Sequence, residues 1–260
     1  MASLLLPISP DDDAAQLMSA GTRIARNLDY QLIPFTYNKS EKEVRNPLVH
    51  ASVTVQHSDK NFFHTIYSFL NSTEHDVTLV VLTPKVINLK SRNKATHFFA
   101  KFRSLKVPYL VLPDAPDSGW CPENIFFPVC LQDGEKEASA WAGFWTRTHQ
   151  GRLHIIHPEF RNKTTKQYLQ RNLAFIRNLF NQSNVVFETC PAGCKRKEAR
   201  SKAIEMAGNS RDSLLVLPAT RLNSPEYVFT GPPEIRLLKN RGNTPVLFVN
   251  PLHDLYVPCG

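Results

Sequence analysis

The sequence predicts an α/β protein built from two tandem units, each with a five-stranded parallel sheet. Short apolar segments alternate with amphipathic helical segments along the whole chain, a pattern typical of parallel sheets covered by helices. Four of the apolar segments recur in the same order in the second half. The 260 residues are also too many for one small α/β unit and fit two units of roughly 100–150 residues each.

The repeat is visible in the segments that we expect to be strands. They are short, rich in Val, Leu, Ile and Phe, and nearly continuous in hydrophobicity, as burial on both faces of a sheet requires. The corresponding pairs are 4–8 with 125–129, 32–36 with 153–157, 76–82 with 212–218, and 107–113 with 244–250. The offset grows from 121 to 136 residues between the second and third pairs, so the second unit holds an insertion.

Helices are predicted between these strands. In residues 14–28 the apolar residues Leu17, Ala20, Ile24 and Leu28 form one stripe, and the acidic run at 11–13 suits a helix N-terminus better than a metal site. The other expected helices are 61–70 and 96–105 in the first unit, and 135–149, 164–181, 195–207 and 234–240 in the second.

Two of these helices have a distinctive apolar face. Residues 135–149 place Ala138, Trp141, Ala142 and Trp145 on one stripe, and residues 164–181 place Leu169, Leu173, Ile176 and Phe180 on another. The first unit has only residues 38–47 where the second has its long central helix, so we expect that helix to be reduced there. The proline-rich stretch at 113–124 reads as a linker, which gives domains at 1–113 and 125–260 joined by 114–124.

Composition narrows the class of protein. No window approaches the apolar length of a membrane span, and the N-terminal apolar run stops at Pro7 without a basic region before it, so we expect a cytoplasmic protein. The formal net charge is +8, and the densest basic run is 195–202. Such a run could contact phosphates, but the solvated face of a helix explains it as well, and we do not expect a nucleic-acid partner.

The cysteines do not indicate a disulfide framework, because there are five and they are scattered. Only Cys190 and Cys194 are close in sequence. A zinc site needs about four ligands, and no second Cys or His pair lies near these two cysteines in sequence. We therefore interpret the cysteines as reduced and without a functional role, and we expect no metal or other cofactor. We interpret His154 and His157, on a predicted strand, as structural.

The order of elements resembles the universal stress protein family. That family opens on an apolar strand ending near a proline, as at Pro128-Val129, and its second strand often ends in a histidine, as at His157. An Asp-led fourth strand follows, as at Asp212, and the last strand resembles Pro-Val-Leu-Val, as at 245–249. The resemblance implies a Rossmann-like fold of the adenine nucleotide alpha hydrolase kind.

Nucleotide-binding members of that family carry Gly-x-x-Gly, nine residues, then Gly-Ser/Thr after strand four. Glycines let backbone N–H groups approach phosphate oxygens. In the second unit Pro218 and Arg221 fall in the first part of this motif, and Gly231 and Pro232 in the last. Proline has no N–H to offer, and Arg221 fills space that a glycine would leave open.

The first unit departs further from the motif, because residues 82–85 and 95–96 hold no glycine at all. The first-strand aspartate of the family is Ser9 in the first unit and Cys130 in the second. The resemblance therefore implies negligible ATP binding in the family's manner. An arginine at 221 beside Gly231 could hold another anion, although a solvated loop arginine is the reading that we favour.

We therefore expect a non-catalytic binding or regulatory protein of a stress response that takes an unknown protein partner or small ligand. No Gly-x-Ser-x-Gly nucleophile motif occurs, and we do not expect an enzyme. The alternative is an ATP- or AMP-type nucleotide-binding stress protein with a nonstandard phosphate loop in its second domain. The apolar last strands, at 109–112 and 246–249, are expected to pair antiparallel within the chain as a pseudo-dimer, with further homo-oligomers open.

Overall fold

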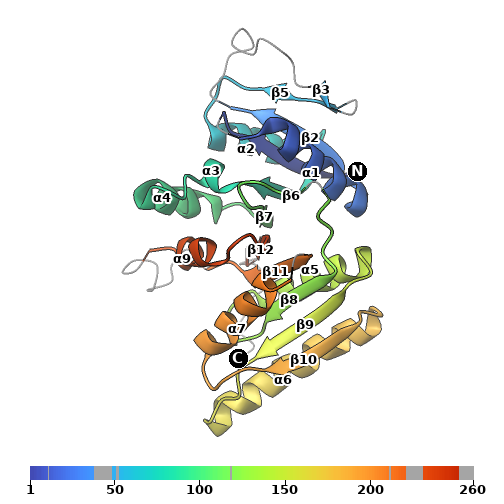
Figure 1. Cartoon of the computed structure of the whole chain (residues 1–260), viewed down its shortest axis with the longest axis vertical. Helices are drawn as coiled ribbons and strands as arrows, with labels where there is room; N and C mark the ends of the chain where they lie inside the picture. Colours follow the sequence, from blue (N-terminus) through green and yellow to red (C-terminus); the bar gives the residue numbers. More distant parts are fainter. Residues whose placement is uncertain are drawn as a thin grey trace. The chain divides into compact units, whose positions relative to one another are not determined.

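The computed structural model describes residues 1–10, 12–37, 49–50, 53–117, 119–210, 212–220 and 231–251. The chain divides into two units, shown in Figure 1. The first comprises Met1–Phe102 and Val107–Trp120, and the second comprises Arg103–Lys106 and Cys121–Gly260. The division thus falls inside the proline-rich stretch, and a four-residue segment, Arg103–Lys106, groups with the second unit, which the linear division at 113 did not anticipate.

The first unit is a parallel sheet with helices. Its elements are β1 (Ala2–Ile8), α1 (Ala14–Leu28), β2 (Gln31–Thr36), β3 (Val49–His50), β4 (Val53–Thr54), β5 (Gln56–His57), α2 (Phe62–Leu70), β6 (Asp76–Leu82), α3 (Pro84–Ile87), α4 (Arg92–Phe102) and β7 (Tyr109–Val111). The strands lie in the order β5-β2-β1-β6-β7, and each neighbouring pair is parallel. β3 and β4 form a separate antiparallel pair. The reduced helix expected at 38–47 lies outside the described residues.

Local sequence explains where the helices of this unit begin. The Asp13 carboxylate accepts a hydrogen bond from the Gln16 N–H at 3.1 Å, so the predicted capping by the acidic run is confirmed at this residue. The Asn61 side chain caps α2 in the same way, through the His64 N–H. Helix α1 ends at Leu28, and its C-cap, Asp29, adopts a left-handed conformation with φ 57°.

The second unit repeats the alternation of strands and helices. Its elements are β8 (Asn124–Pro128), α5 (Glu135–Thr148), β9 (Arg152–His157), α6 (Lys163–Gln182), β10 (Phe187–Pro191), α7 (Arg196–Gly208), β11 (Ser213–Pro218), α9 (Pro233–Asn240) and β12 (Val246–Val249). The strands lie in the order β10-β9-β8-β11-β12, again all parallel. The predicted α/β class with parallel strands is confirmed.

The cores agree with the predicted apolar faces, with one exception. All four residues predicted to form the face of α6 are buried, namely Leu169, Leu173, Ile176 and Phe180. In α5, Ala138, Ala142 and Trp145 are buried but Trp141 is only half-buried, packed edge-on against Phe144 with ring centroids 5.6 Å apart. The buried face of α5 also includes the small residues Ser139 and Gly143, and a Cβ at Gly143 would lie 3.1 Å from the Phe180 ring of α6.

In each unit the first strand lies in the middle of the sheet, with the second strand on one side and the fourth on the other. The chain therefore adds strands first on one side of the first strand and then, after a crossover, on its other side. Ligands of open α/β sheets bind at such a switch point, outside the carboxyl ends of the strands. This switch point lies at the carboxyl ends of β1 and β6 in the first unit and of β8 and β11 in the second. Among the described residues, no helix is long and apolar enough to cross a membrane.

Candidate ligand site in the second unit

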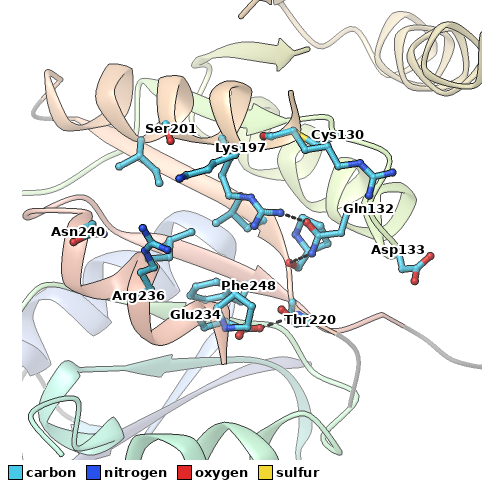
Figure 2. A pocket seen from close by; sticks show the side chains of 18 residues that line it. Cys130, Gln132, Asp133, Lys197, Ser201, Thr220, Glu234, Arg236, Asn240 and Phe248 are labelled. Carbon is cyan, nitrogen blue, oxygen red and sulfur yellow. Dashed lines mark hydrogen bonds between the residues drawn. The ribbon is translucent and has the colours of Figure 1, made fainter. Parts of the chain in front are cut away.

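A cavity of about 950 Å³ opens at the carboxyl ends of β8 and β11, between the helices α7 and α9 (Figure 2). It therefore lies at the switch point of the second unit's sheet. The residues that line it are Cys130, Gln132, Asp133, Arg196, Lys197, Arg200, Ser201, Ile204, Leu217, Pro218, Ala219, Thr220, Pro233, Glu234, Arg236, Leu237, Asn240 and Phe248.

Positive charge dominates this lining. Lys197 on α7 and Arg236 on α9 extend into the cavity from its two sides, as Figure 2 shows. Both side chains are exposed, and neither makes an ion pair within the part of the chain that the structure describes. The Arg200 guanidinium donates to Gln132 Oε1, and Gln132 Nε2 donates to Pro218 O at 3.4 Å, so this third cation is tied to the cavity wall.

The two helices are placed by their first turns. The Glu198 carboxylate accepts hydrogen bonds from the Cys194 and Lys195 N–H groups, which fixes the start of α7 and so the basic residues that follow. The helix α9 begins at Pro233, a residue suited to a first helical position because its missing N–H would have no partner within the helix. The next residue, Glu234, points back toward the end of β11.

Glu234 holds the backbone at the end of β11. Its Oε1 accepts from the Thr220 N–H at 2.8 Å, and its Oε2 accepts from Arg103 Nη2 at 2.7 Å. The side chains of this ion pair are each only 2% exposed. The Thr220 N–H, at the carboxyl end of β11, is thus held by a carboxylate of the chain itself and is not free to bind an external anion.

Glu135 holds the backbone of the loop after β8 through hydrogen bonds. Its Oε1 accepts from the N–H groups of Cys130 at 2.6 Å and Gln132 at 2.9 Å, and its Oε2 accepts from Asn172 Nδ2 at 2.6 Å. Burial raises the pKa of this carboxyl to about 7, although its hydrogen bonds act in the opposite direction. The preceding Gly134 has φ 83°, and a Cβ there would lie 3.2 Å from that of Pro218.

Cys130 follows the end of β8 and is a neutral group. The thiol is buried, and its Sγ lies 3.6 Å from Arg196 O. Burial, and then the charge of Glu135, raise the pKa of this thiol to about 12. The side chain therefore carries no negative charge at neutral pH and offers no carboxylate to a ribose or an adenine.

The structure brings together only some of the residues that the sequence singled out. Cys130 and Pro218 both line the cavity. Gly231 has φ 77° and Pro232 precedes α9 as its N-cap, and neither lines the cavity. Arg221 lies outside the described residues.

Sequence reasoning missed Glu135, Glu234 and Arg236, and it placed Lys197 on a solvated helix face. That face is exposed as expected, but it also forms one wall of the cavity. The only signal in the sequence was the acidic residue in the first turn of two predicted helices. Such residues ordinarily complement the helix dipole, so nothing distinguished these two from ordinary first-turn acids.

The switch point of the first unit is arranged differently. Asp12 Oδ2 accepts from the Ser9 N–H at 2.8 Å, and its Oδ1 accepts from the Thr83 hydroxyl at 3.1 Å. Thr83 also caps the four-residue helix α3 through the Val86 N–H. A single carboxylate thus links the carboxyl end of β1 to that of β6, and burial raises its pKa.

No family model matches the sequence, and no curated protein matches it. Solved structures do share the fold. A universal stress protein from Archaeoglobus fulgidus DSM 4304 is 12% identical with a TM-score of 0.62, and 97% of each chain is covered. A putative universal stress protein from Pseudomonas aeruginosa UCBPP-PA14 is 15% identical with a TM-score of 0.59, covering 95% of this chain and 92% of that one.

The same fold also occurs in a protein of another kind. The cytoplasmic domain of a prokaryotic cation chloride cotransporter is 10% identical with a TM-score of 0.58, covering 96% of this chain and 95% of that one. Identities this low establish the fold alone. The chain has the α/β fold seen in universal stress proteins, and its function has to be argued from its own site.

Proposed function

We propose that the protein is a non-catalytic binding or regulatory protein, made of two degenerate copies of the universal stress protein unit, that takes a small anionic ligand in the cavity of its second unit. The observation that carries this proposal is the pair of cations, Lys197 and Arg236, that extend into one cavity from opposite helices. Two like charges brought toward the same space repel each other, and an anion between them turns that repulsion into attraction.

The shape of the cavity favours a small molecule over a protein surface. Its volume of about 950 Å³ is that of a ligand pocket, and its wall includes apolar residues such as Leu217, Leu237 and Phe248 beside the cations. A ligand with an anionic group and an apolar body fits both parts of this lining. Neither a catalytic nucleophile nor a paired acid and base is needed for such binding.

ATP bound in the family's manner is not part of this proposal. The Thr220 N–H is held by Glu234, the thiol of Cys130 is neutral, and Pro218 has no N–H. The alternative function, nucleotide binding through a nonstandard loop, is favoured by one observation, the position of the cavity at the sheet's switch point.

Calorimetric titration of the full chain with inorganic pyrophosphate, tripolyphosphate, AMP and ATP distinguishes these functions. We expect the inorganic anions to bind and the double variant Lys197→Ala with Arg236→Ala to weaken them at least about tenfold, since each charged contact contributes about 1.5–3 kcal/mol. The matched control is Lys202→Ala, because Lys202 is an exposed cation on the same helix that pairs with Glu205 instead.

We expect ATP to bind no more tightly than tripolyphosphate, because the cavity offers no carboxylate at Cys130 for the nucleoside. ATP binding at least tenfold tighter than tripolyphosphate would support the alternative. Failure of all four anions to bind would overturn the proposal. The stress-response role, the cytoplasmic location and the internal pseudo-dimer formed through the last strands stay predictions. Aggregation or self-association of a 1–113 fragment would support the last of these.

A further inference from the structure

We propose that His154, Glu188 and Cys190 form a binding site for a thiophilic divalent cation of the Zn²⁺ kind, separate from the anion cavity. The three residues come from the neighbouring strands β9 and β10, and none of them lines the cavity. Their candidate ligand atoms, an imidazole nitrogen, a carboxylate oxygen and a thiol sulfur, all lie within 4.8 Å of one another.

Parallel pairing of the two strands creates this cluster. Glu188 lies opposite His154 in the register, and Cys190 lies two residues further along β10. Because side chains alternate between the faces of a strand, Glu188 and Cys190 emerge on the same face. The Cys190 Sγ lies 3.9 Å from Glu188 Oε1, and His154 Nδ1 lies 2.6 Å from the same oxygen.

The imidazole is fixed in the orientation that a metal ligand needs. Its Nε2 lies 3.0 Å from Asn124 Oδ1, and its ring stacks on Phe126 with centroids 4.6 Å apart and an interplanar angle of 12°. An amide oxygen only accepts, so this contact places a proton on Nε2. The second nitrogen, Nδ1, faces Glu188 Oε1. Metal-binding histidines are commonly oriented by such a second hydrogen bond.

The contact between Nδ1 and Glu188 places a nitrogen ligand and an oxygen ligand side by side. Nδ1 and Glu188 Oε1 are 2.6 Å apart, which is a hydrogen-bond distance, so a proton lies between them in the metal-free protein. A divalent metal would take the place of that proton and of the thiol proton of Cys190, releasing both to solvent. A metal ion can reach the site from solvent at Glu188, whose side chain is 47% exposed. The His154 side chain is only 10% exposed and lies deeper.

The ligand types select the metal. Thiolate and imidazole together favour Zn²⁺ and similar ions, whereas Mg²⁺ and Ca²⁺ prefer oxygen ligands throughout. Three protein ligands leave the fourth tetrahedral position for water. Cys194, which is close to Cys190 in sequence, is not part of the cluster. Cys190 is therefore the only thiol ligand of the proposed site.

Titration of the chelator-treated full chain with Zn²⁺, and with Co²⁺ as a spectroscopic substitute, tests the site. We expect one ion per chain and, with Co²⁺, a thiolate-to-metal charge-transfer band. Cys190→Ser should abolish the band and weaken Zn²⁺ binding at least tenfold, whereas the matched control Cys194→Ser should keep both. Asn124→Leu should weaken binding about 10–100-fold through the lost hydrogen bond to His154, and Asn124→Asp, which still accepts, should restore it.

His154→Gln provides a second variant if Cys190→Ser changes the fold, which circular dichroism checks, and His157→Gln is its control. Absence of a stoichiometric ion and of the Co²⁺ band in the wild-type chain would overturn the proposal. Loss of the band on Cys194→Ser with retention on Cys190→Ser would also overturn it. Because these variants leave Lys197 and Arg236 untouched, pyrophosphate binding should not change. The metal site and the anion cavity are therefore tested independently of each other.

Discussion

The two units place acidic residues differently at the same point of the same sheet. In the first unit one carboxylate, Asp12, joins the end of β1 to Thr83 after β6. In the second unit two carboxylates act apart: Glu135 holds the loop after β8, and Glu234 holds the end of β11. A single bridging acid draws the two strand ends together, whereas two separate acids stabilise each end without joining them.

The comparison shows that the chain's own side chains can occupy backbone N–H groups at the switch point of such a sheet. In both units, carboxylates of the chain accept hydrogen bonds from backbone N–H groups at the switch point, where a phosphate or another anion would otherwise be received. In the second unit the space between the loops is lined instead by cations from helices α7 and α9. The following predictions test this difference, from the largest expected effect to the smallest.

Removal of the Glu234 carboxylate should have the largest effect. Glu234→Ala leaves the Arg103 guanidinium buried without its carboxylate partner and the Thr220 N–H without an acceptor. Breaking a buried pair from one side costs about 3–5 kcal/mol, so the free energy of unfolding should fall by that amount in guanidinium denaturation. Glu205→Ala, at an exposed acid that pairs on the surface of α7, is the control and should change it by less than about 1 kcal/mol.

Glu135→Ala should rank second. It removes the acceptor of the Cys130 and Gln132 N–H groups and of the Asn172 amide. We expect a loss of about 2–4 kcal/mol in the same measurement, since each buried donor left unsatisfied costs about 1–3 kcal/mol and some will find water. A loss below about 1 kcal/mol would mean that the loop after β8 does not depend on this carboxylate.

The pH dependence of stability should also reveal Glu135. Its pKa in the folded protein is about 7, above the ordinary value of 4.5, so the folded state binds this proton more tightly than the unfolded state does. Its contribution is therefore fully present below about pH 4.5 and is lost as the pH rises to about 7. Comparing unfolding of wild type and Glu135→Gln across this window should show a shallower fall in the variant. Equal slopes would contradict the raised pKa.

Asp12→Ala in the first unit should cost less than either change in the second. The Asp12 side chain is only partly buried, whereas those of Glu135 and Glu234 are buried, and it accepts from one backbone N–H and one hydroxyl. We expect about 1–2 kcal/mol in denaturation, with Asp12→Asn losing less because an amide oxygen still accepts one bond. A loss as large as that of Glu234→Ala would remove the distinction drawn between the units.

The double variant Lys197→Ala with Arg236→Ala should change the stability of the ligand-free protein least, by about 0.5 kcal/mol or less, as is usual for exposed residues. Its effect should appear with ligand instead. Pyrophosphate at saturating concentration should raise the thermal midpoint of wild type and leave that of the double variant unchanged. An equal rise in both would place the anion elsewhere.

Most of the secondary structure followed from local patterns in the sequence. The bounds of α1 are those predicted, because its apolar stripe and its Asp13 cap are both local features. The parallel strands followed from continuous apolar runs that require burial on both faces. The third strands, β5 and β10, were not located by residue, because Gln56–His57 and Phe187–Pro191 lie at a sheet edge and lack that run.

The chemistry of the sites was decided by tertiary structure. Sequence alone predicted a lost phosphate loop, since prolines and missing glycines are visible in one dimension. It did not reveal that Glu135 and Glu234 accept hydrogen bonds from backbone N–H groups at the ends of β8 and β11, because a first-turn acid has the same appearance whether it faces solvent or a buried N–H. Nor did it pair His154 with Cys190. Parallel strands align residues that a whole crossover helix separates in the chain, and no local spacing records that register.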